Sequence, residues 1–406
     1  MNTLLFALIG ALRSHRWLRL LGFAYLLSSL GNGLTQIIIF GQLLHWQASP
    51  ATLTMVYMLS MLPSFIGSIW GEMLCKKMSP LRILIFTEIS GLLVLVFPLY
   101  GLLHHSIPAL LVVQCAEALF SGISYPALAL LFKRGLRPDE LPAATAMETL
   151  IFASQVLLGT SLGVVLFGLI DSLHLLAIDA LSFAASVALL MISGAFFREA
   201  EHQPAEVLSG RQAPLWHVIS PLQKRSILLL PALAAVGSPA MALLPALAQE
   251  IRPEDSVGLA LPLLFARSLG QLCGPLMLDA SKLQRYSANN GLLLVCLMLF
   301  IGAYFLLPLS VGSPFAGLTL IFCAHMASNI VFALGTFSIL RNFAQNDVAK
   351  ASAISWRGQV LTAAVATGLT SAMAQSFGAF TALYSISSLS LGAVCLLLWL
   401  NRTSNE

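Results

Sequence analysis

The sequence is dominated by a succession of apolar segments separated by short polar connections. A helix that crosses the hydrocarbon core of a bilayer needs about 20 apolar residues. A β-barrel strand would instead alternate apolar and polar residues over about ten positions, whereas residues 83–103 are apolar on both faces. The chain is therefore predicted to be an all-α membrane protein with twelve transmembrane helices, at 18–45, 51–74, 81–103, 107–132, 142–168, 173–197, 226–249, 257–279, 288–308, 313–340, 348–375 and 378–400.

The composition agrees with this prediction. The chain is 58% apolar and 9% charged, with a mean hydropathy of +0.88, whereas soluble domains are about 45–50% apolar and about 25% charged. These values exclude a soluble enzyme, a disordered chain and a nucleic-acid-binding domain. The six cysteines have no metal-ligand spacing, and the His104-His105 pair has no third ligand nearby, so neither a metal site nor another cofactor is expected. The sequence contains no nucleophile–base spacing and no phosphate-binding loop, so it is not predicted to be an enzyme.

The positions of Lys and Arg predict the orientation in the membrane. Of the 21 such residues, Arg267 and Arg357 lie within predicted spans and Arg252 lies in a connection on one side. The others lie at the N-terminus, at the C-terminus, or in connections on the opposite side and the span ends next to them: Arg13, Arg16, Arg19, Lys76, Lys77, Arg82, Lys133, Arg134, Arg137, Arg198, Arg211, Lys224, Arg225, Lys282, Arg285, Arg341, Lys350 and Arg402. Because cytoplasmic connections carry the excess of Lys and Arg, both termini are predicted to be cytoplasmic.

One long polar stretch, residues 199–225, divides the predicted helices into two sets of six. The predicted organisation is a cytoplasmic N-terminal segment (1–16), a six-helix bundle (17–198), a cytoplasmic linker (199–225), a second six-helix bundle (226–401) and a cytoplasmic tail (402–406). In residues 1–16 the apolar run precedes the charges, the reverse of a signal peptide, so this segment is predicted to be a short helix at the membrane surface.

Two short matches indicate that the halves are related. The second predicted helix contains Gly67-Ser-Ile-Trp-Gly71, and the eighth contains Gly270-Gln-Leu-Cys-Gly274, 203 residues later. The starts of the fifth and eleventh helices match near Ala144 and Ala351, 207 residues apart. Duplicated six-helix halves related by a pseudo-two-fold axis are typical of transporters that bind substrate between the halves near the bilayer midplane.

With these motifs the whole chain resembles the major facilitator superfamily of transporters. Gly67, Gly71, Lys76 and Lys77 fit the gating motif of that family after the second helix. Cys75 stands where the family usually has an aspartate.

Glu72 lies one turn before Cys75 on the same helix face, and it is the candidate substitute for the aspartate in the gating motif. The segment Gly159-Thr-Ser-Leu-Gly163 resembles the antiporter motif of the fifth helix but lacks its proline.

Four stretches resemble, more specifically, the ShiF-type group of facilitators encoded beside aerobactin siderophore genes in enteric bacteria. They are SSLGNGLTQIIIFGQLL, FASQVLLGTSLGVVLFG, LLLPALAAVGSPAMALLPALAQ and ALPLLFARSLGQLCGPL. The resemblance implies a bacterial inner-membrane protein that exports an anionic siderophore such as aerobactin, coupled to protons, by alternating access.

Polar residues within the spans are the site candidates, because a charge at mid-bilayer costs about 2.5–3.5 kcal/mol or more. The resemblance implies that helices 1, 4, 5, 7, 8, 10 and 11 line the transport cavity and that helices 3 and 6, which carry Glu88 and Asp179, support them. Glu117 and Glu148 are the predicted proton-coupling acids. The predicted substrate-binding residues are Arg267, Gln271, Arg357, Asn32, Gln36, Gln155, His325 and Asn329.

Two guanidinium groups predict an anionic small-molecule substrate, because Arg binds carboxylates in bidentate fashion. Aerobactin carries several carboxylates on a citrate centre and fits this expectation. Structural alternatives stay open: Arg267 as an ion-pair partner, Arg357 in a gate salt bridge, and Glu148 paired with a nearby cytoplasmic Lys or Arg.

Functional alternatives also stay open. They are multidrug efflux of cationic or apolar compounds, uptake of a siderophore or organic anion, and a scaffold or sensor that does not transport. The expected partners are the substrate, protons and the lipid bilayer, with no nucleic acid. The chain is expected to be a monomer.

Overall fold

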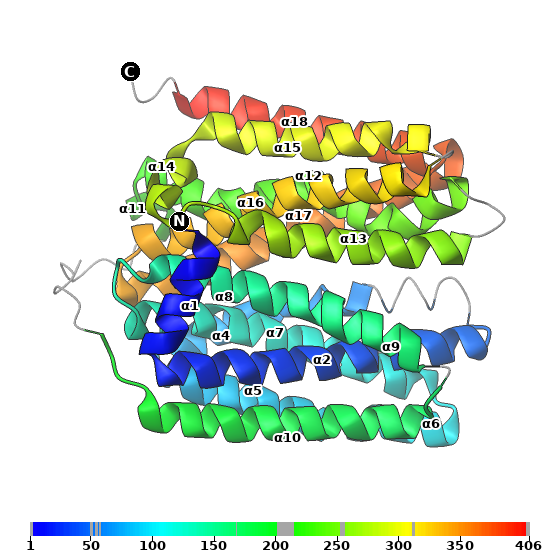
Figure 1. Ribbon diagram of the computed structural model, residues 1–406, viewed down its shortest axis with the longest axis horizontal. Helices are drawn as coiled ribbons and strands as arrows, with labels where there is room; N and C mark the ends of the chain where they lie inside the picture. Colours follow the sequence, from blue (N-terminus) through cyan, green and yellow to red (C-terminus); the bar gives the residue numbers. More distant parts are fainter. Residues whose placement is uncertain are drawn as a thin grey trace. The chain divides into compact units, whose positions relative to one another are not determined.

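The computed structural model describes residues 3–48, 52, 56, 58–167, 169–200, 215–251, 256–310 and 313–402 (Figure 1). Within these residues the chain is almost entirely helical. It divides into two compact units. The N-terminal unit contains residues 8–200 and 348–357, and the C-terminal unit contains residues 1–7, 201–347 and 358–406. Most of the predicted linker, residues 201–214, lies outside the described residues, as does Arg252.

The first half of the chain supplies the helices of the N-terminal unit. They are α1 (Leu4–Ser14, which begins in the residues of the other unit), α2 (Arg16–His45), α4 (Pro63–Cys75), α5 (Pro80–Val94), α6 (Val96–His104), α7 (Ile107–Gly135), α8 (Leu141–Ser154), η1 (Gln155–Thr160), α9 (Ser161–Leu166) and α10 (Ser172–Phe196). The segment η1 is a π-helix, a local widening of the helix that is frequent at functional sites.

The second half supplies the helices of the C-terminal unit. They are α11 (Leu215–Val218), α12 (Pro221–Ile251), α13 (Ser256–Leu276), η3 (Ala280–Lys282), α14 (Leu283–Ala288), α15 (Asn290–Leu306), η4 (Leu307–Ser310), α16 (Pro314–Asn342), α17 (Gln345–Phe377) and α18 (Ala379–Arg402). Residues 348–357, which follow the first three residues of α17, belong to the N-terminal unit.

Among the described residues, ten helical segments are long and apolar enough to cross a membrane, against twelve predicted from the sequence. The predicted spans 51–74 and 257–279 correspond to α4 and α13. α4 has only 13 residues, and residues 53–55 and 57 before it lie outside the described part of the chain. Side chains at the start of α13 are likewise not described. The difference between ten and twelve therefore concerns these two helices.

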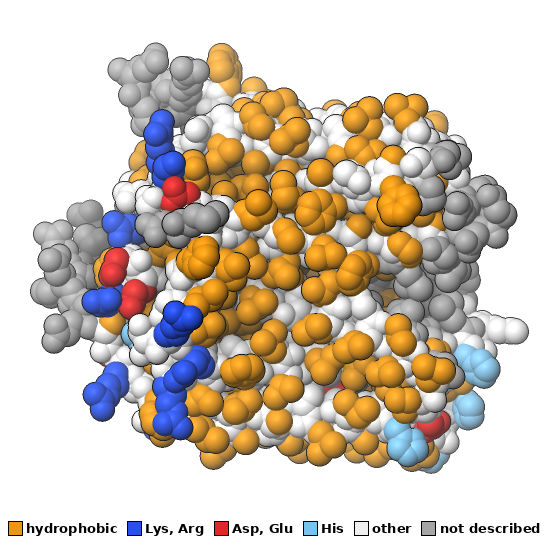
Figure 2. Space-filling model, viewed as in Figure 1, with side chains coloured by type: hydrophobic (Ala, Val, Ile, Leu, Met, Phe, Trp, Pro, Cys, Tyr) orange, Lys and Arg blue, Asp and Glu red, His pale blue; other side chains and the backbone are white. Residues whose placement is uncertain are grey.

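The outer surfaces of both units are apolar, as a lipid environment requires. Leu93, Leu181, Met191, Leu389 and Trp399 are each more than 60% exposed. In Figure 2, hydrophobic side chains cover the helices of the face shown. Soluble monomers rarely expose apolar patches larger than a few hundred Å², so this surface indicates contact with lipid.

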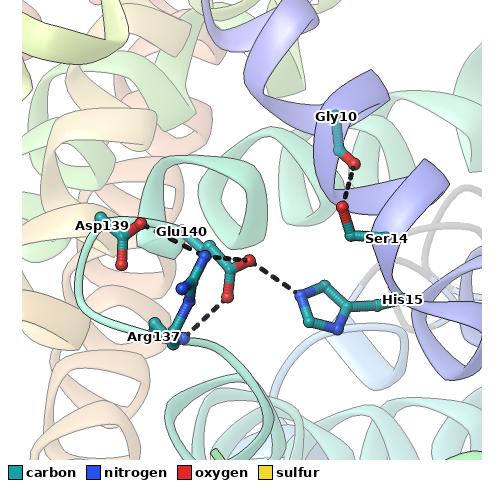
Figure 3. Close-up of polar contacts among 6 residues, drawn as sticks. All are labelled: Gly10, Ser14, His15, Arg137, Asp139 and Glu140. Carbon is teal, nitrogen blue, oxygen red and sulfur yellow. Dashed lines mark hydrogen bonds and ion pairs between the residues drawn. The ribbon is translucent and has the colours of Figure 1, made fainter.

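The Lys and Arg side chains of the N-terminal unit gather at one end of its helices (Figure 2). At this end Glu140, before α8, accepts a hydrogen bond from the backbone N–H of Arg137 at 3.0 Å. The Glu140 carboxylate also lies 2.9 Å from Nε2 of His15, between α1 and α2, and 3.3 Å from Nη2 of Arg137 (Figure 3). Asp139 lies 3.6 Å from the same guanidinium. These contacts attach the α1–α2 junction to the α7–α8 connection.

The glycines of the internal match have the same packing role in the two units. A Cβ atom added at Gly67 or Gly71 of α4 would overlap the backbone oxygens of residues 119 and 123 of α7. One added at Gly270 or Gly274 of α13 would overlap those of residues 322 and 326 of α16. The partner positions are also separated by 203 residues, so the repeat seen in sequence extends to the contacts. In both units, the glycines let two helices approach at backbone distance.

Candidate functional site

The C-terminal unit contains a buried polar cluster around Arg267 of α13. Arg267 is 9% exposed, and His325 of α16 and Tyr304 of α15 are 1% exposed. The Tyr304 hydroxyl lies 2.8 Å from Nε2 of His325, and the Phe300 ring packs edge-on against His325. The Arg267 guanidinium acts electrostatically on both Tyr304 and His325. A cation and two polar side chains therefore share one buried region of this unit.

Two further predicted residues join the same helix pair. Asn329 of α16 donates a hydrogen bond from Nδ2 to the backbone oxygen of Gln271, at 2.7 Å. Gln271 follows Arg267 by one turn on α13 and is 2% exposed. Among the described atoms, the Gln271 side-chain oxygen has no hydrogen-bond partner. The structure thus brings together four predicted substrate-binding residues from α13 and α16, and it adds Tyr304, which the sequence did not indicate.

Arg357, the other predicted anion-binding residue, contacts an acid in the N-terminal unit. Its Nη2 lies 3.0 Å from Oε2 of Glu72 on α4, and both side chains are less than one-fifth exposed. Lys76 approaches the other oxygen of Glu72, at 3.5 Å. The ring of Trp356, next to Arg357, packs against Tyr125 of α7 at 4.3 Å between centroids. This geometry corresponds to the gate alternative, in which Glu72 acts in place of the aspartate that the motif lacks; a substrate contact of Arg357 remains a prediction.

Two buried acids of the N-terminal unit are hydrogen-bonded to α2. Ser28 of α2 donates a hydrogen bond to Oε1 of Glu88 on α5 at 3.1 Å, and Thr35 of α2 donates one to Asp179 on α10. Asp179 acts electrostatically on Glu88 and on Glu117 of α7. Glu117, a predicted proton-coupling residue, therefore lies near Asp179, an acid that the resemblance placed on a supporting helix.

The remaining predicted residues are more scattered. Asn32 donates to Ser28 Oγ at 3.4 Å and so joins the polar face of α2. Gln36 is half-buried on α2, and Gln155 is exposed at the start of η1. Glu148 is 6% exposed on α8. Their roles in binding and proton coupling remain predictions.

The sequence contains a signal for the acids around α2. Glu88 and Asp179 are buried side chains within apolar segments, and an ionisable residue in such a segment is a candidate for a functional site. The resemblance, however, implies that their helices are supports. Tyr304 gives no such signal, since a tyrosine is common in membrane helices.

No family model matches the chain. A protein of Pseudescherichia vulneris described as an uncharacterized 29.9 kDa protein in the crtE 3′ region is 62% identical over 74 residues. That segment is 18% of this chain and 27% of the relative, so the match spans about a quarter of the relative's length.

Solved structures of transporters match nearly the whole chain. A bacterial homologue of the iron transporter ferroportin, in an outward-facing state, has a TM-score of 0.69 at 15% identity, covering 96% of this chain and 99% of that one. The human organic anion transporter MFSD10 has a TM-score of 0.64 at 15% identity, covering 93% and 97%. The fucose:proton symporter FucP of E. coli has a TM-score of 0.64 at 14% identity, covering 94% and 98%.

The chain has the fold of the major facilitator superfamily. The fold class predicted from the sequence is confirmed. The major facilitator fold holds substrates of different charge and size, and a fold alone does not specify a substrate. Side chains determine which substrate binds, and the cluster around Arg267 is the main candidate for this role.

Proposed function

We propose that this protein is a secondary transporter that exports an anionic siderophore of the aerobactin type in exchange for protons. The observation that carries the proposal is the buried guanidinium of Arg267, which shares one region of the C-terminal unit with Tyr304, His325 and Asn329. A carboxylate bound there would gain a charge-assisted hydrogen bond in a medium of low dielectric constant.

Proton coupling is assigned to Glu117. This acid lies on α7, a helix of the N-terminal unit, and its Oε1 has no hydrogen-bond partner among the described atoms. A carboxyl group in such a setting can gain and lose a proton during a transport cycle. The C-terminal unit would then bind the substrate anion, and the N-terminal unit would bind the proton.

The known transporters of similar fold support a transport function in general terms. One is described as an organic anion transporter, another as a homologue of an iron transporter and a third as a sugar:proton symporter. Their substrates differ, so the choice of an anionic siderophore rests on Arg267 and on the ShiF-type stretches of the sequence.

The proposal is tested first in cells. The gene is deleted in a bacterium that makes aerobactin, and siderophore in the medium is measured during iron starvation. We expect secretion to fall and to be restored by the wild-type gene but not by Arg267→Ala. Undiminished secretion from the deletion strain contradicts export, and loss of growth on ferric siderophore as the sole iron source would indicate uptake instead.

The second test measures binding by the purified protein. Citrate and aerobactin are titrated against wild type, Arg267→Ala, Arg267→Lys and the control Arg285→Ala, which removes an exposed cation of the same unit. Loss of a charge-assisted hydrogen bond costs about 1.5–3 kcal/mol, so Arg267→Ala should weaken binding roughly 10- to 150-fold. Arg267→Lys should weaken it less, and the control should bind like wild type. Equal affinities throughout contradict the proposal.

One observation favours a second candidate, efflux of cationic compounds. Glu88 and Asp179 are buried in the N-terminal unit and Glu117 is half-buried on α7. Acids are the groups that would bind a lipophilic cation. Expression of the protein in a drug-sensitive strain would then raise resistance to cationic dyes and drugs. A susceptibility panel that does not change with expression counts against this candidate.

A further inference from the structure

The helix α2 has a polar face inside the N-terminal unit. Four residues at helical spacing form this face: Tyr25, Ser28, Asn32 and Thr35. Ser28 donates to Glu88 of α5, Asn32 donates to Ser28, and Thr35 donates to Asp179 of α10. One helix therefore supplies hydroxyl groups to acids on two other helices.

The acids on either side of this face are deeply buried. Asp179 is fully buried and Glu88 is 7% exposed. The Glu88 carboxyl group also lies beside the Ser186 hydroxyl of α10. Ser182, one turn after Asp179, also contacts the Asp179 carboxyl, at 3.2 Å. Both acids are thus in contact with hydroxyl groups from neighbouring helix turns.

The helices around the cluster supply acids but no nearby cation. Glu88 is in electrostatic range of Tyr25 on α2 and Asp179 on α10, and Asp179 is also in range of Glu117 on α7. Packed against α2 as well, α8 adds one more acid, Glu148, while η1 and α9 carry no charged residue. No ion pair joins Glu88, Glu117 or Asp179 to a cation in the described part of the chain. On α2, α5, α7 and α10, Lys and Arg occur only in the first or last turn, at Arg16, Arg19, Arg82, Lys133 and Arg134.

Buried carboxylates without cations are costly, and two that are close together repel each other. Protonation removes both the cost of burial and the repulsion, because a protonated carboxyl group is neutral. A metal ion fits less well: within the described residues, no group of three or more His, Cys, Asp or Glu has the geometry to hold one. The hydroxyl groups of α2 can accept and donate protons, so they can join the acids into one network.

We propose that Glu88 and Asp179, linked by the polar face of α2 and extended by Glu117, form a binding site for exchangeable protons within the N-terminal unit. Glu88 and Asp179 lie on helices that the family resemblance treats as supports. Proton binding itself does not depend on the substrate. Its coupling to transport rests on the proposed function.

The first experiment measures proton binding directly. Infrared spectra of the purified full chain in lipid vesicles are recorded over pH 5–9 in water and in deuterated water, where the C=O band of a protonated carboxyl group shifts. We expect such a band in wild type at neutral pH and a loss of part of it in Glu88→Gln and Asp179→Asn. The control Asp139→Asn, which removes an exposed acid, should leave the band unchanged.

Two results overturn the proposal. One is the absence of a protonated carboxyl band in wild type at neutral pH, which requires no variant to fold. The other is a band that is unchanged in well-folded Glu88→Gln and Asp179→Asn. Glu88→Asp keeps the carboxyl group and should keep the band, so it separates loss of the acid from a change in packing.

A second experiment separates this inference from the proposed function. Proton flux driven by an aerobactin gradient is measured in vesicles that contain wild type or Glu88→Gln, and aerobactin binding is measured in parallel. We expect Glu88→Gln to lose proton flux and retain binding. If wild type moves no protons with aerobactin but shows the infrared band, the proposed function fails and the proton site stands. If flux occurs without the band, the proton site fails.

Discussion

At the residue scale, Glu72 is the half-buried acid that holds two cations of the N-terminal unit. Its contact with Arg357 is shorter and less exposed than its contact with Lys76, whose side chain is 66% exposed. Contacting charged residues show coupling energies of about 0.5–3 kcal/mol. We therefore expect a double-mutant cycle of Glu72→Gln and Arg357→Gln, read by thermal unfolding, to give a coupling in this range.

Lys76 provides the matched comparison on the same acid. Exposed ion pairs contribute about 0–1 kcal/mol, so Lys76→Gln should couple to Glu72→Gln much more weakly than Arg357→Gln does. Strictly additive effects of Glu72→Gln and Arg357→Gln would show that the pair is not formed in solution and would return Arg357 to the substrate-binding candidates.

Glu140 carries a second prediction at this scale, one that depends on pH. Burial favours a higher pKa for its carboxyl group, but hydrogen bonds from the Arg137 backbone, His15 and the Arg137 side chain outweigh burial and lower the pKa (Figure 3). An acid whose pKa is lowered by folding stabilises the folded state above its unfolded value of about 4.3. That contribution is lost as the pH falls through the lowered value.

The measurement compares the melting temperatures of wild type and Glu140→Gln from pH 7 to pH 3. Wild type should be the more stable protein at pH 6–7, and the difference should shrink below about pH 4. Asp139→Asn is the control, since that acid is 71% exposed and should change the profile little. A difference in melting temperature that is constant from pH 7 to pH 3 would show that the ionised Glu140 carboxylate does not stabilise the folded state.

At the element scale, the glycines of α4 and α13 determine how closely these helices can pack. A Cβ atom at Gly270 would overlap the backbone of Phe322, whereas one at Gly302 of α15 would meet no atom within 4 Å. Overpacking costs about 1–3 kcal/mol, and an exposed helical Gly→Ala change gains up to about 1 kcal/mol. Gly270→Ala should therefore lower the melting temperature, and Gly302→Ala should leave it unchanged or raise it.

The repeat makes the same experiment possible in the other unit. Gly67→Ala places a Cβ atom against the backbone of α7 and should destabilise the protein about as much as Gly270→Ala. Equal stability of all three variants and wild type would mean that the helix pairs separate at little cost, and the shared packing role of the glycines would be wrong.

The same elements show what sequence could and could not predict. The glycine pairs were recognisable because their spacing recurs and small residues have a specific use at close helix contacts. The acids around α2 stand out one by one as ionisable residues in apolar segments, but their association does not. Because α2, α5, α7 and α10 are apolar over most of their surface, periodicity does not say which face is inward. The hydrogen bonds of Ser28 and Thr35 join helices that are far apart in sequence. They depend on packing that a local pattern does not contain.

At the scale of the whole molecule, the arrangement of charge predicts the topology. Lys and Arg of the N-terminal unit gather at one end of its helices (Figure 2). His104 and His105 lie at the C-terminal end of α6, the helix that follows α5. Cytoplasmic connections carry the excess of Lys and Arg. We expect a fluorescent protein fused after residue 406 to be fluorescent, and alkaline phosphatase fused there to be inactive, because the C-terminus is predicted to be cytoplasmic.

The matched fusion places alkaline phosphatase after His105, in the connection between α6 and α7, where it should be active because that connection is predicted to face the periplasm. The two reporters together decide whether the number of crossings between residues 105 and 406 is odd or even. Phosphatase activity at both positions would require an even number there and would contradict the predicted twelve spans. That result would also remove the assignment of Arg267 to the eighth span and, with it, the pseudo-symmetric comparison of the two units in the membrane.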